Sequence, residues 1–187
     1  ILYELAKLEG HPDNTTPAYL GGLVFAFFTE KDKLHFFKKK FPSNIRLFLF
    51  ITSYETDTNN SRKKLPTKYP VDDVIFNMAR IGTWMEFLTT KKIKHLLLAL
   101  DDRLHTPYRL INEIVLKQIC DFAKEKGIGY ALSGSGPTIL FFTDEKWKES
   151  RIKELGMEIQ KISSIHKLSY KFFPIEPDNK GTTAKRI

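Results

Sequence analysis

The spacing of apolar and polar positions predicts a chain in which strands and helices are mixed. Short apolar runs typical of strands occupy residues 23–28, 46–52, 129–132, 139–142 and 168–175, with an edge strand expected at 34–38. Apolar residues at helical spacing predict helices over 1–8, 71–88, 93–100, 110–126 and 145–155, and a short one within 57–64. This order lacks the regular alternation of a doubly wound sheet. We therefore expect an α+β fold, in which helices pack on one face of an antiparallel sheet.

Two segments carry further local signals. Pro12 and Pro17 bracket a stretch that we expect to be irregular, because proline lacks a backbone donor and restricts its neighbour. The helix expected at 71–88 has Asp72 and Asp73 in its first turn, where the helix dipole favours acidic side chains. Its apolar residues share one face at helical spacing, and they are Val74, Ile75, Met78, Ile81, Met85 and Leu88.

A loop of small residues separates the two apolar runs at 129–132 and 139–142. It reads Ser133-Gly134-Ser135-Gly136-Pro137-Thr138. The two glycines can adopt positive φ and leave room for a ligand, while the hydroxyls and exposed backbone N–H groups can surround an anion such as a phosphate or carboxylate. A tight turn within a strand pair explains these residues equally well. The loop is not a Walker A sequence, because no Gly-Lys-Ser/Thr follows it.

Composition narrows the class of protein. The chain has 187 residues, 42% of them hydrophobic, which is enough for a folded core. No apolar run approaches ~18 residues, so we expect no transmembrane helix and no membrane partner. The single Cys120 excludes an internal disulfide, as is usual in the cytoplasm. The net charge of +8 could attract nucleic acid or an anionic substrate, but the lysines are scattered, and we favour a solvated lysine-rich surface.

Two further motifs change the interpretation of the glycine-containing loop. Glu9-Gly10-His11-Pro12-Asp13-Asn14 lies near the start of the chain, and Asp102-Arg103-Leu104-His105-Thr106-Pro107-Tyr108-Arg109 lies in its middle. Together with Ser133–Thr138, and in this order, they resemble the homoserine kinase family of the GHMP small-molecule kinase superfamily. The resemblance runs from about Glu4 to Phe142, and more loosely to Gly181.

The resemblance implies a division into domains. Members of the superfamily pair a ribosomal-S5-like N-terminal domain with a ferredoxin-like C-terminal domain. Residues 1–42 would then be the tail of the first domain, and residues 43–187 the second. The family's main ATP loop, a proline followed by a Gly-Leu-Gly-Ser-Ser-Ala-type sequence, has no counterpart here. We therefore expect the C-terminal part of a longer kinase, which on its own has no significant kinase activity.

The resemblance also implies cationic groups for a substrate carboxylate. Arg109 closes the Pro-Tyr-Arg motif, at a position where the family uses an arginine. Thr58 and Arg62 precede a Leu-Pro pair with the family's spacing, and residues four apart share one face of a helical turn. Two arginines would hold one carboxylate through charge-assisted hydrogen bonds. Without the resemblance, Arg62 would simply be read as exposed. Asp102 and His105 are expected to hold the Arg109 loop in place.

The remaining roles are implied by the same resemblance. His11 would hydrogen-bond the substrate and Asp13 would pair with its ammonium group, although turn and cap residues would look the same. Glu4, which precedes a Leu-Ala pair, would be the catalytic magnesium ligand, with Glu9 as the alternative. The ATP-facing floor of the pocket would be formed by Ser133, Gly134, Ser135 and Gly136.

The sequence thus predicts a cytoplasmic, ATP- and Mg²⁺-dependent kinase that phosphorylates the side-chain hydroxyl of L-homoserine in threonine biosynthesis. Its expected partners are the missing N-terminal part and, in a homodimer, a second copy. Three other functions stay open: another GHMP kinase acting on mevalonate-type or sugar alcohols, a non-catalytic module that binds amino acids, and charge-driven binding to nucleic acid.

Overall fold

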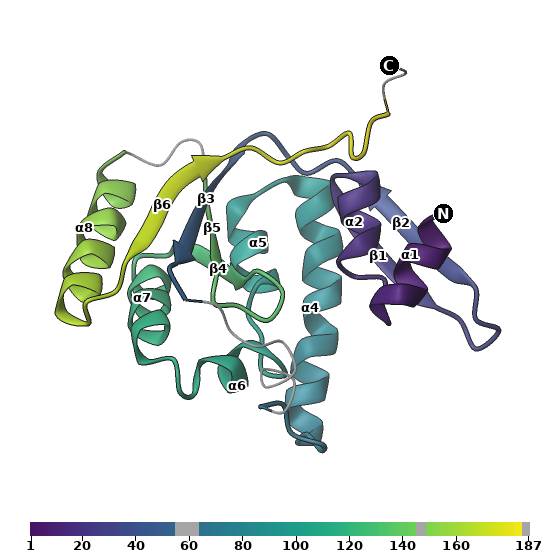
Figure 1. The fold of residues 1–187 in the computed structure, drawn as a ribbon, viewed down its shortest axis with the longest axis horizontal. Helices are drawn as coiled ribbons and strands as arrows, with labels where there is room; N and C mark the ends of the chain where they lie inside the picture. The colour runs from purple at the N-terminus through teal and green to yellow at the C-terminus, as the bar shows by residue number, and fades with distance from the viewer. Residues whose placement is uncertain (55–63, 145–148, 185–187) are drawn as a thin grey trace. The chain divides into compact units, whose positions relative to one another are not determined.

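A computed structural model describes residues 1–54, 64–144 and 149–184 (Figure 1). The chain forms two compact units. The first, here the hairpin unit, is Ile1–Ser43 together with the segment that begins at Glu176. The second, here the sheet unit, is Asn44–Ile175. The short helix expected within 57–64 falls almost wholly outside the described residues.

The hairpin unit contains two helices and a two-stranded sheet. Helices α1 (Leu2–Glu9) and α2 (Thr15–Leu20) precede the antiparallel strands β1 (Leu23–Phe28) and β2 (Leu34–Lys39). Gly10 ends α1 in the left-handed region, at φ 83°, and its N–H donates to the carbonyl of Lys7. The expectation of an irregular segment up to Pro17 was wrong, because Pro17 lies in the first turn of α2, where its missing N–H costs no helical hydrogen bond.

The C-terminal segment is held by hydrogen bonds within the hairpin unit. Gly22 N donates to Asp178 O at 2.7 Å, and Thr182 N donates to Tyr19 O at 3.0 Å. The backbones also approach closely, since a Cβ on Gly181 would lie 2.3 Å from the carbonyl carbon of Leu20. Sequence reasoning placed this segment in the second domain, whereas these contacts are with the first unit. The assignment of the two domains by family stays a prediction.

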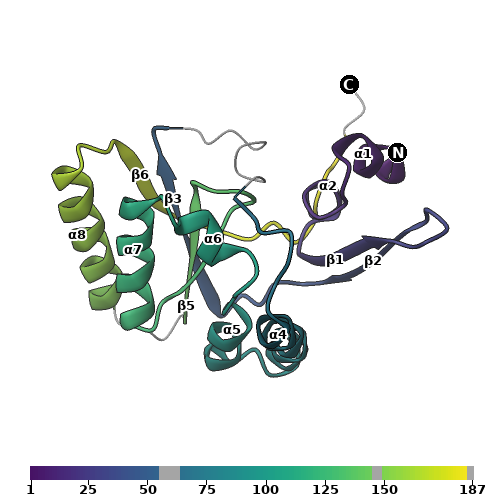
Figure 2. The same ribbon diagram turned by 90° about the horizontal axis from the view of Figure 1, so that it is seen from below.

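The sheet unit has a four-stranded antiparallel sheet in the order β4-β5-β3-β6. The strands are β3 (Ile45–Thr52), β4 (Gly129–Leu132), β5 (Ile139–Asp144) and β6 (Tyr170–Ile175). Helices α7 (Ile114–Glu125) and α8 (Glu149–Ile165) lie side by side on one face (Figures 1 and 2). The core between them includes Phe50, Ile119, Phe141, Leu155 and Ile159. The predicted α+β fold with helices on one face of an antiparallel sheet is confirmed.

The described part of the sheet unit also contains the helices α4 (Val71–Thr90), α5 (Ile93–Ala99) and α6 (Thr106–Leu110). Helix α4 keeps the predicted face, but Ile75, Met78, Ile81 and Met85 on that face are all more than half exposed. Phe87, which was not part of that set, is fully buried. Among the described residues, no helix is both long and apolar enough to cross a membrane.

Candidate functional site

The glycine loop, Ser133–Thr138, joins β4 to β5. Ser133 N donates to Thr138 O at 2.9 Å, and Gly136 N donates to Ser133 O at 3.1 Å. Gly134 and Gly136 have φ values of 59° and 80°, in the left-handed region that side chains other than glycine avoid. A Cβ on Gly134 would meet no atom within 4 Å, so the backbone conformation, and not crowding, requires glycine there. The space in front of Gly134 is open to a ligand.

Arg109 lies beside this loop. It is in the last turn of α6 and its side chain is buried, with 5% of the residue exposed. A small cavity is lined by Arg109 together with Ser135, Gly136 and Pro137 of the loop. The structure therefore brings together two motifs that are more than 20 residues apart in the sequence, as the resemblance implied. Their roles in binding stay predictions.

Asp102 fixes the turn that leads into α6. Its carboxylate accepts hydrogen bonds from the backbone N–H groups of Leu104 and Thr106 and from the side-chain amide of Asn77 on α4, the last at 2.9 Å. Burial alone would raise the pKa of Asp102, but these hydrogen bonds favour the charged form and hold the pKa below its ordinary value. The expectation that Asp102 holds the Arg109 loop is supported by these contacts.

Sequence reasoning missed an ionic cluster in the same small cavity. Glu113 lines it with Lys64, and its carboxylate accepts hydrogen bonds from Lys64 Nζ at 3.0 Å and from the Tyr54 hydroxyl at 2.9 Å. Burial and the hydrogen bond to this carboxylate raise the pKa of Tyr54. No local pattern could have found the cluster, because its members are drawn from three separate segments. It places a second cationic side chain, Lys64, beside the cavity that Arg109 lines.

In the hairpin unit, the His-Pro-Asp-Asn motif forms the connection between α1 and α2. His11 Nδ1 lies against the Asp13 carboxylate, and His11 Nε2 is 3.8 Å from a carboxylate oxygen of Glu9. The side chain of Asp13 is 72% exposed, so one of its faces can reach a ligand. The structure thus groups His11 and Asp13 of this connection with Glu9, the last residue of α1. The substrate contacts of His11 and Asp13 stay predictions.

The predicted magnesium ligand, Glu4, is an exposed residue in the first turn of α1. Among the described residues there is no group of three or more His, Cys, Asp or Glu side chains that could hold a metal ion by themselves. A single accessible carboxylate still fits Mg²⁺, which in kinases is held mainly by nucleotide phosphates and water. The choice between Glu4 and Glu9 stays a prediction.

Two predicted substrate contacts, Thr58 and Arg62, lie outside the described residues. The pairing of Arg62 with Arg109 on one carboxylate therefore stays a prediction. Glu4, His11 and Asp13 belong to the hairpin unit, whereas Arg109 and Ser133–Gly136 belong to the sheet unit. That these residues meet in one active site also stays a prediction.

Comparison with known proteins identifies the class. Residues 88–155 match the family model for the GHMP kinases C terminal domain. This stretch includes α5, α6, Arg109 and the glycine loop.

Within that class, the chain is a homologue of the homoserine kinases. It is 34% identical to homoserine kinase of Caldicellulosiruptor bescii over 186 residues. This matched region covers 98% of this chain and 59% of the relative. It is also 34% identical to the Caldicellulosiruptor saccharolyticus homoserine kinase over 184 residues, 98% of this chain and 58% of the relative. The chain therefore spans less than two thirds of the length of these relatives.

Solved structures confirm the fold. The crystal structure of homoserine kinase from Cytophaga hutchinsonii superposes with a TM-score of 0.78 at 20% identity, covering 91% of this chain and 53% of that protein. A putative homoserine kinase from Listeria monocytogenes gives a TM-score of 0.65 at 22% identity, covering 97% of this chain and 58% of that protein. The resemblance inferred from three short motifs is confirmed by the family model and by the two relatives.

Proposed function

We propose that the chain is part of an ATP-dependent homoserine kinase. The observation that carries the proposal is the buried Arg109 beside the glycine loop, in a chain 34% identical to homoserine kinases along nearly its whole length. In the reaction, the hydroxyl oxygen of L-homoserine bonds to the γ-phosphorus of ATP. The bond between that phosphorus and the bridging oxygen breaks, ADP leaves with the electron pair, and the hydroxyl proton is released.

The proposed residues bind different groups of the substrate, according to the charge of each group. Arg109 and Arg62 hold the carboxylate, Asp13 pairs with the ammonium group, and His11 hydrogen-bonds the polar end of the molecule. Thr58 adds a hydroxyl to the substrate contacts. Arg109 suits this task because its planar guanidinium can donate two parallel hydrogen bonds to one carboxylate.

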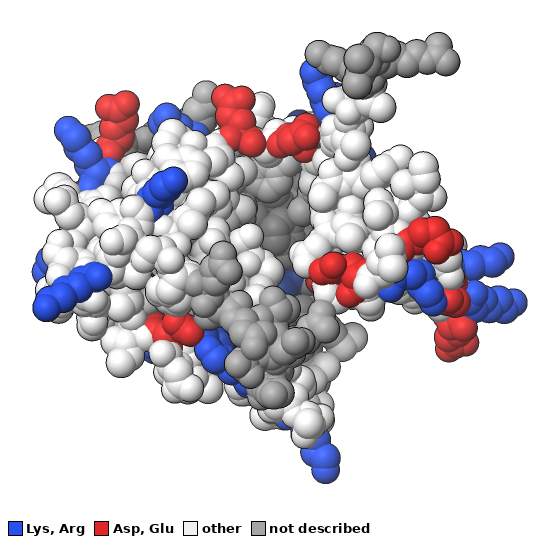
Figure 3. Space-filling model, in the orientation of Figure 1, with Lys and Arg blue, Asp and Glu red and all other residues white. Residues whose placement is uncertain are grey.

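The nucleotide side is supplied by the glycine loop and by the part of the longer enzyme that this chain does not contain. Backbone N–H groups of Ser133–Gly136 are suited to an anionic group. Mg²⁺ bound at Glu4 would neutralise phosphate charge during transfer. We place the enzyme in the cytoplasm and in threonine biosynthesis, and a homodimer is an additional expectation. On the face shown in Figure 3, Lys and Arg side chains are interspersed with acidic ones, which favours a solvated surface over a nucleic-acid interface.

The test compares the chain with a fusion that restores the missing length. The fusion joins about the N-terminal two fifths of the Caldicellulosiruptor bescii homoserine kinase to this chain. This is about the share of that relative that the chain does not cover. We expect ADP release with L-homoserine from the fusion and none from the chain alone. Ordinary turnover by the 187-residue chain would contradict the proposed division of the active site. A fusion that phosphorylates mevalonate or a sugar in preference to L-homoserine would assign another GHMP kinase.

A second candidate is a non-catalytic module that binds an amino acid, and the buried Arg109 fits it as well, because binding a carboxylate requires no phosphoryl transfer. Calorimetry with L-homoserine and L-threonine, with and without ATP, separates the two. Binding that is indifferent to ATP, from a fusion that remains inactive, would support the module.

A further inference from the structure

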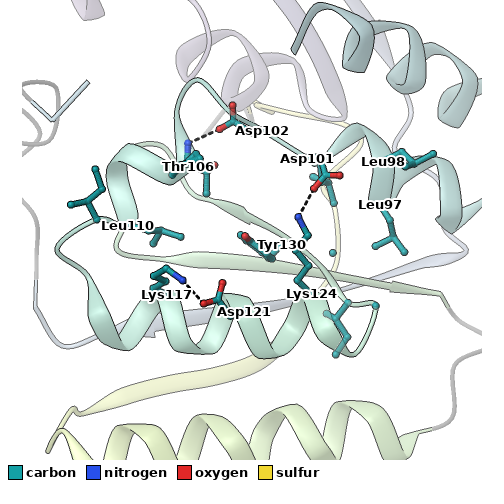
Figure 4. Close-up of a pocket in the computed structure, with 16 residues that line it drawn as sticks. Leu97, Leu98, Asp101, Asp102, Thr106, Leu110, Lys117, Asp121, Lys124 and Tyr130 are labelled. Carbon is teal, nitrogen blue, oxygen red and sulfur yellow. Dashed lines mark hydrogen bonds and ion pairs between the residues drawn. The ribbon is translucent and has the colours of Figure 1, made fainter. Parts of the chain in front are cut away.

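A second pocket lies in the sheet unit, on the side of α6 where α5, α7 and the start of β4 meet (Figure 4). Its volume is about 610 Å³, within the range of small-molecule sites in proteins. Neither Arg109 nor any residue of the glycine loop lines it. Its apolar wall is formed by Leu97, Leu98, Leu100, Leu110, Ile111 and Ile128.

The floor of the pocket is a sheet edge. Within the described segments of the chain, β4 pairs only with β5, and Ser133 and Thr138 form a hydrogen-bonded pair at the end of that ladder. Because such pairs alternate along antiparallel strands, the N–H and C=O of Tyr130 point away from β5. The side chain of Leu100, next to α5, lies close to this end of β4, since a Cβ on Gly129 would lie 2.7 Å from its Cδ1. Tyr130 thus offers one donor and one acceptor on the side of the pocket.

The rim of the pocket carries two ion pairs. Lys124 Nζ on α7 is 2.9 Å from Asp101, and Lys117 pairs with Asp121 one helical turn apart (Figure 4). The third carboxylate in the lining, Asp102, is already bonded to several donors in the turn before α6. The charges that a ligand can reach are therefore balanced, two positive and two negative. A ligand of a single sign would face a like charge at each pair.

From this geometry we infer that the pocket is a second binding site, whose ligand is an amphipathic zwitterion with an apolar body. The apolar body packs against the leucines of α5 and α6. The ligand's carboxylate pairs with Lys124 and its ammonium group pairs with Asp101, so that they replace the Asp101–Lys124 ion pair. The carboxylate also matches the backbone N–H of Tyr130, and the ammonium group matches its carbonyl oxygen. Exposed ion pairs contribute only about 0–1 kcal/mol, so opening this one costs little. A free amino acid with a large apolar side chain is the simplest molecule of this class.

The test follows the methyl resonances of the full 187-residue chain by NMR during titration with L-phenylalanine. We expect saturable shifts at Leu98 and Ile111, which line the pocket and are about half exposed or more. Three probes dissect the ligand: 3-phenylpropanoate lacks the ammonium group, phenethylamine lacks the carboxylate, and glycine lacks the apolar body. Each single-charge analogue should bind about three- to fivefold more weakly than L-phenylalanine, and glycine should give no saturable shift.

Two variants locate the contacts. Leu98→Glu should weaken L-phenylalanine binding at least about tenfold, because it places a charge against the apolar body. Lys124→Met should remove the preference for L-phenylalanine over phenethylamine. The matched control is Lys126→Met, since Lys126 pairs with Glu154 and does not line the pocket.

Any of three results would overturn the inference. The first is the absence of a saturable shift at Leu98 and Ile111, and the second is binding of the single-charge analogues as tight as that of L-phenylalanine. The third is an equal effect of Lys124→Met and Lys126→Met on binding. Shifts confined to the surroundings of Arg109 would likewise assign the binding to the substrate side and overturn it. The readout is binding to the chain, so the result does not depend on whether the kinase proposal holds.

Discussion

Arg109 is a buried cation whose position depends on other residues. Its helix, α6, has only five residues and begins at the turn that Asp102 organises. A guanidinium held in this way is pre-oriented, so it can bind a carboxylate without losing much side-chain entropy. At this scale, sequence motifs alone predicted Arg109 and the glycine loop as site residues. The cluster of Tyr54, Lys64 and Glu113 could not be predicted, because long-range packing brings its members together and leaves no local signal.

Replacing Arg109 in the active fusion tests its role. Arg109→Ala should raise KM for L-homoserine at least about tenfold, because a charge-assisted hydrogen bond contributes about 1.5–3 kcal/mol. Steady-state kinetics measure the effect, and thermal unfolding of the variant provides the control for folding. Unchanged KM with a correctly folded variant would exclude Arg109 as a substrate contact.

Gly134 and Gly82, both with open surroundings, provide a matched pair for stability. Gly134→Ala should destabilise the chain by about 1 kcal/mol, because alanine is strained at φ 59° although nothing lies within 4 Å. Gly82→Ala should stabilise it by about 0.5–1 kcal/mol, since Gly82 lies inside α4 with equally open surroundings. Denaturant unfolding measures both changes, and equal signs would contradict the conformational argument.

Asp102 gives a prediction that depends on pH. Its pKa is lower in the folded chain than in the unfolded chain, so its charge stabilises the fold above about pH 4 and this contribution is lost as pH falls through the folded pKa. Asp102→Asn should therefore cost about 1–2 kcal/mol at pH 7, because one acceptor oxygen is lost. The difference between the two proteins should shrink as pH falls below about 4. Urea unfolding at several pH values checks this, and a difference that is constant with pH would exclude the ionised carboxylate as its cause.

At the scale of elements, hydrophobic patterning predicted most of what the structure contains. Strand β3 and the long helix α4 differ from expectation by two residues or fewer at either end, because their periodicity is sustained over many positions. Helix α2 was missed because Pro17 was taken as a breaker, although proline is compatible with a first turn. The exposure of Ile75 and Met78 could not be predicted either, since periodicity identifies an apolar face but not what covers it.

At the scale of the whole molecule, the chain divides into two units, and the hairpin unit is not continuous in sequence. No composition shift at Glu176 indicated this. The contacts that hold the C-terminal segment require glycine where the backbones meet. Gly181→Ala should therefore loosen the hairpin unit, because its Cβ would lie 2.4 Å from the carbonyl oxygen of Tyr19 and φ is 83°.

Hydrogen exchange measures this loosening amide by amide. We expect faster exchange at Gly22, Phe41 and Thr182 in the Gly181→Ala chain, with the strands of the sheet unit unchanged. Gly10→Ala serves as the control, because Gly10 has the same φ of 83° but nothing within 4 Å. Equal effects of the two substitutions would show that backbone strain, and not the close approach at Gly181, is responsible.

The hydrogen bonds that join Asp178, Asn179 and Thr182 to residues of Ile1–Ser43 also have a consequence for biosynthesis. Residues Ile1–Ser43 emerge from the ribosome before the sheet unit. Their hydrogen-bond partners beyond Glu176 emerge only after the entire sheet unit has been translated. Residues Ile1–Ser43 therefore lack these hydrogen-bond partners until the last part of the sequence has been translated. Nascent chains stalled before Asp178 should be the ones that chaperones retain.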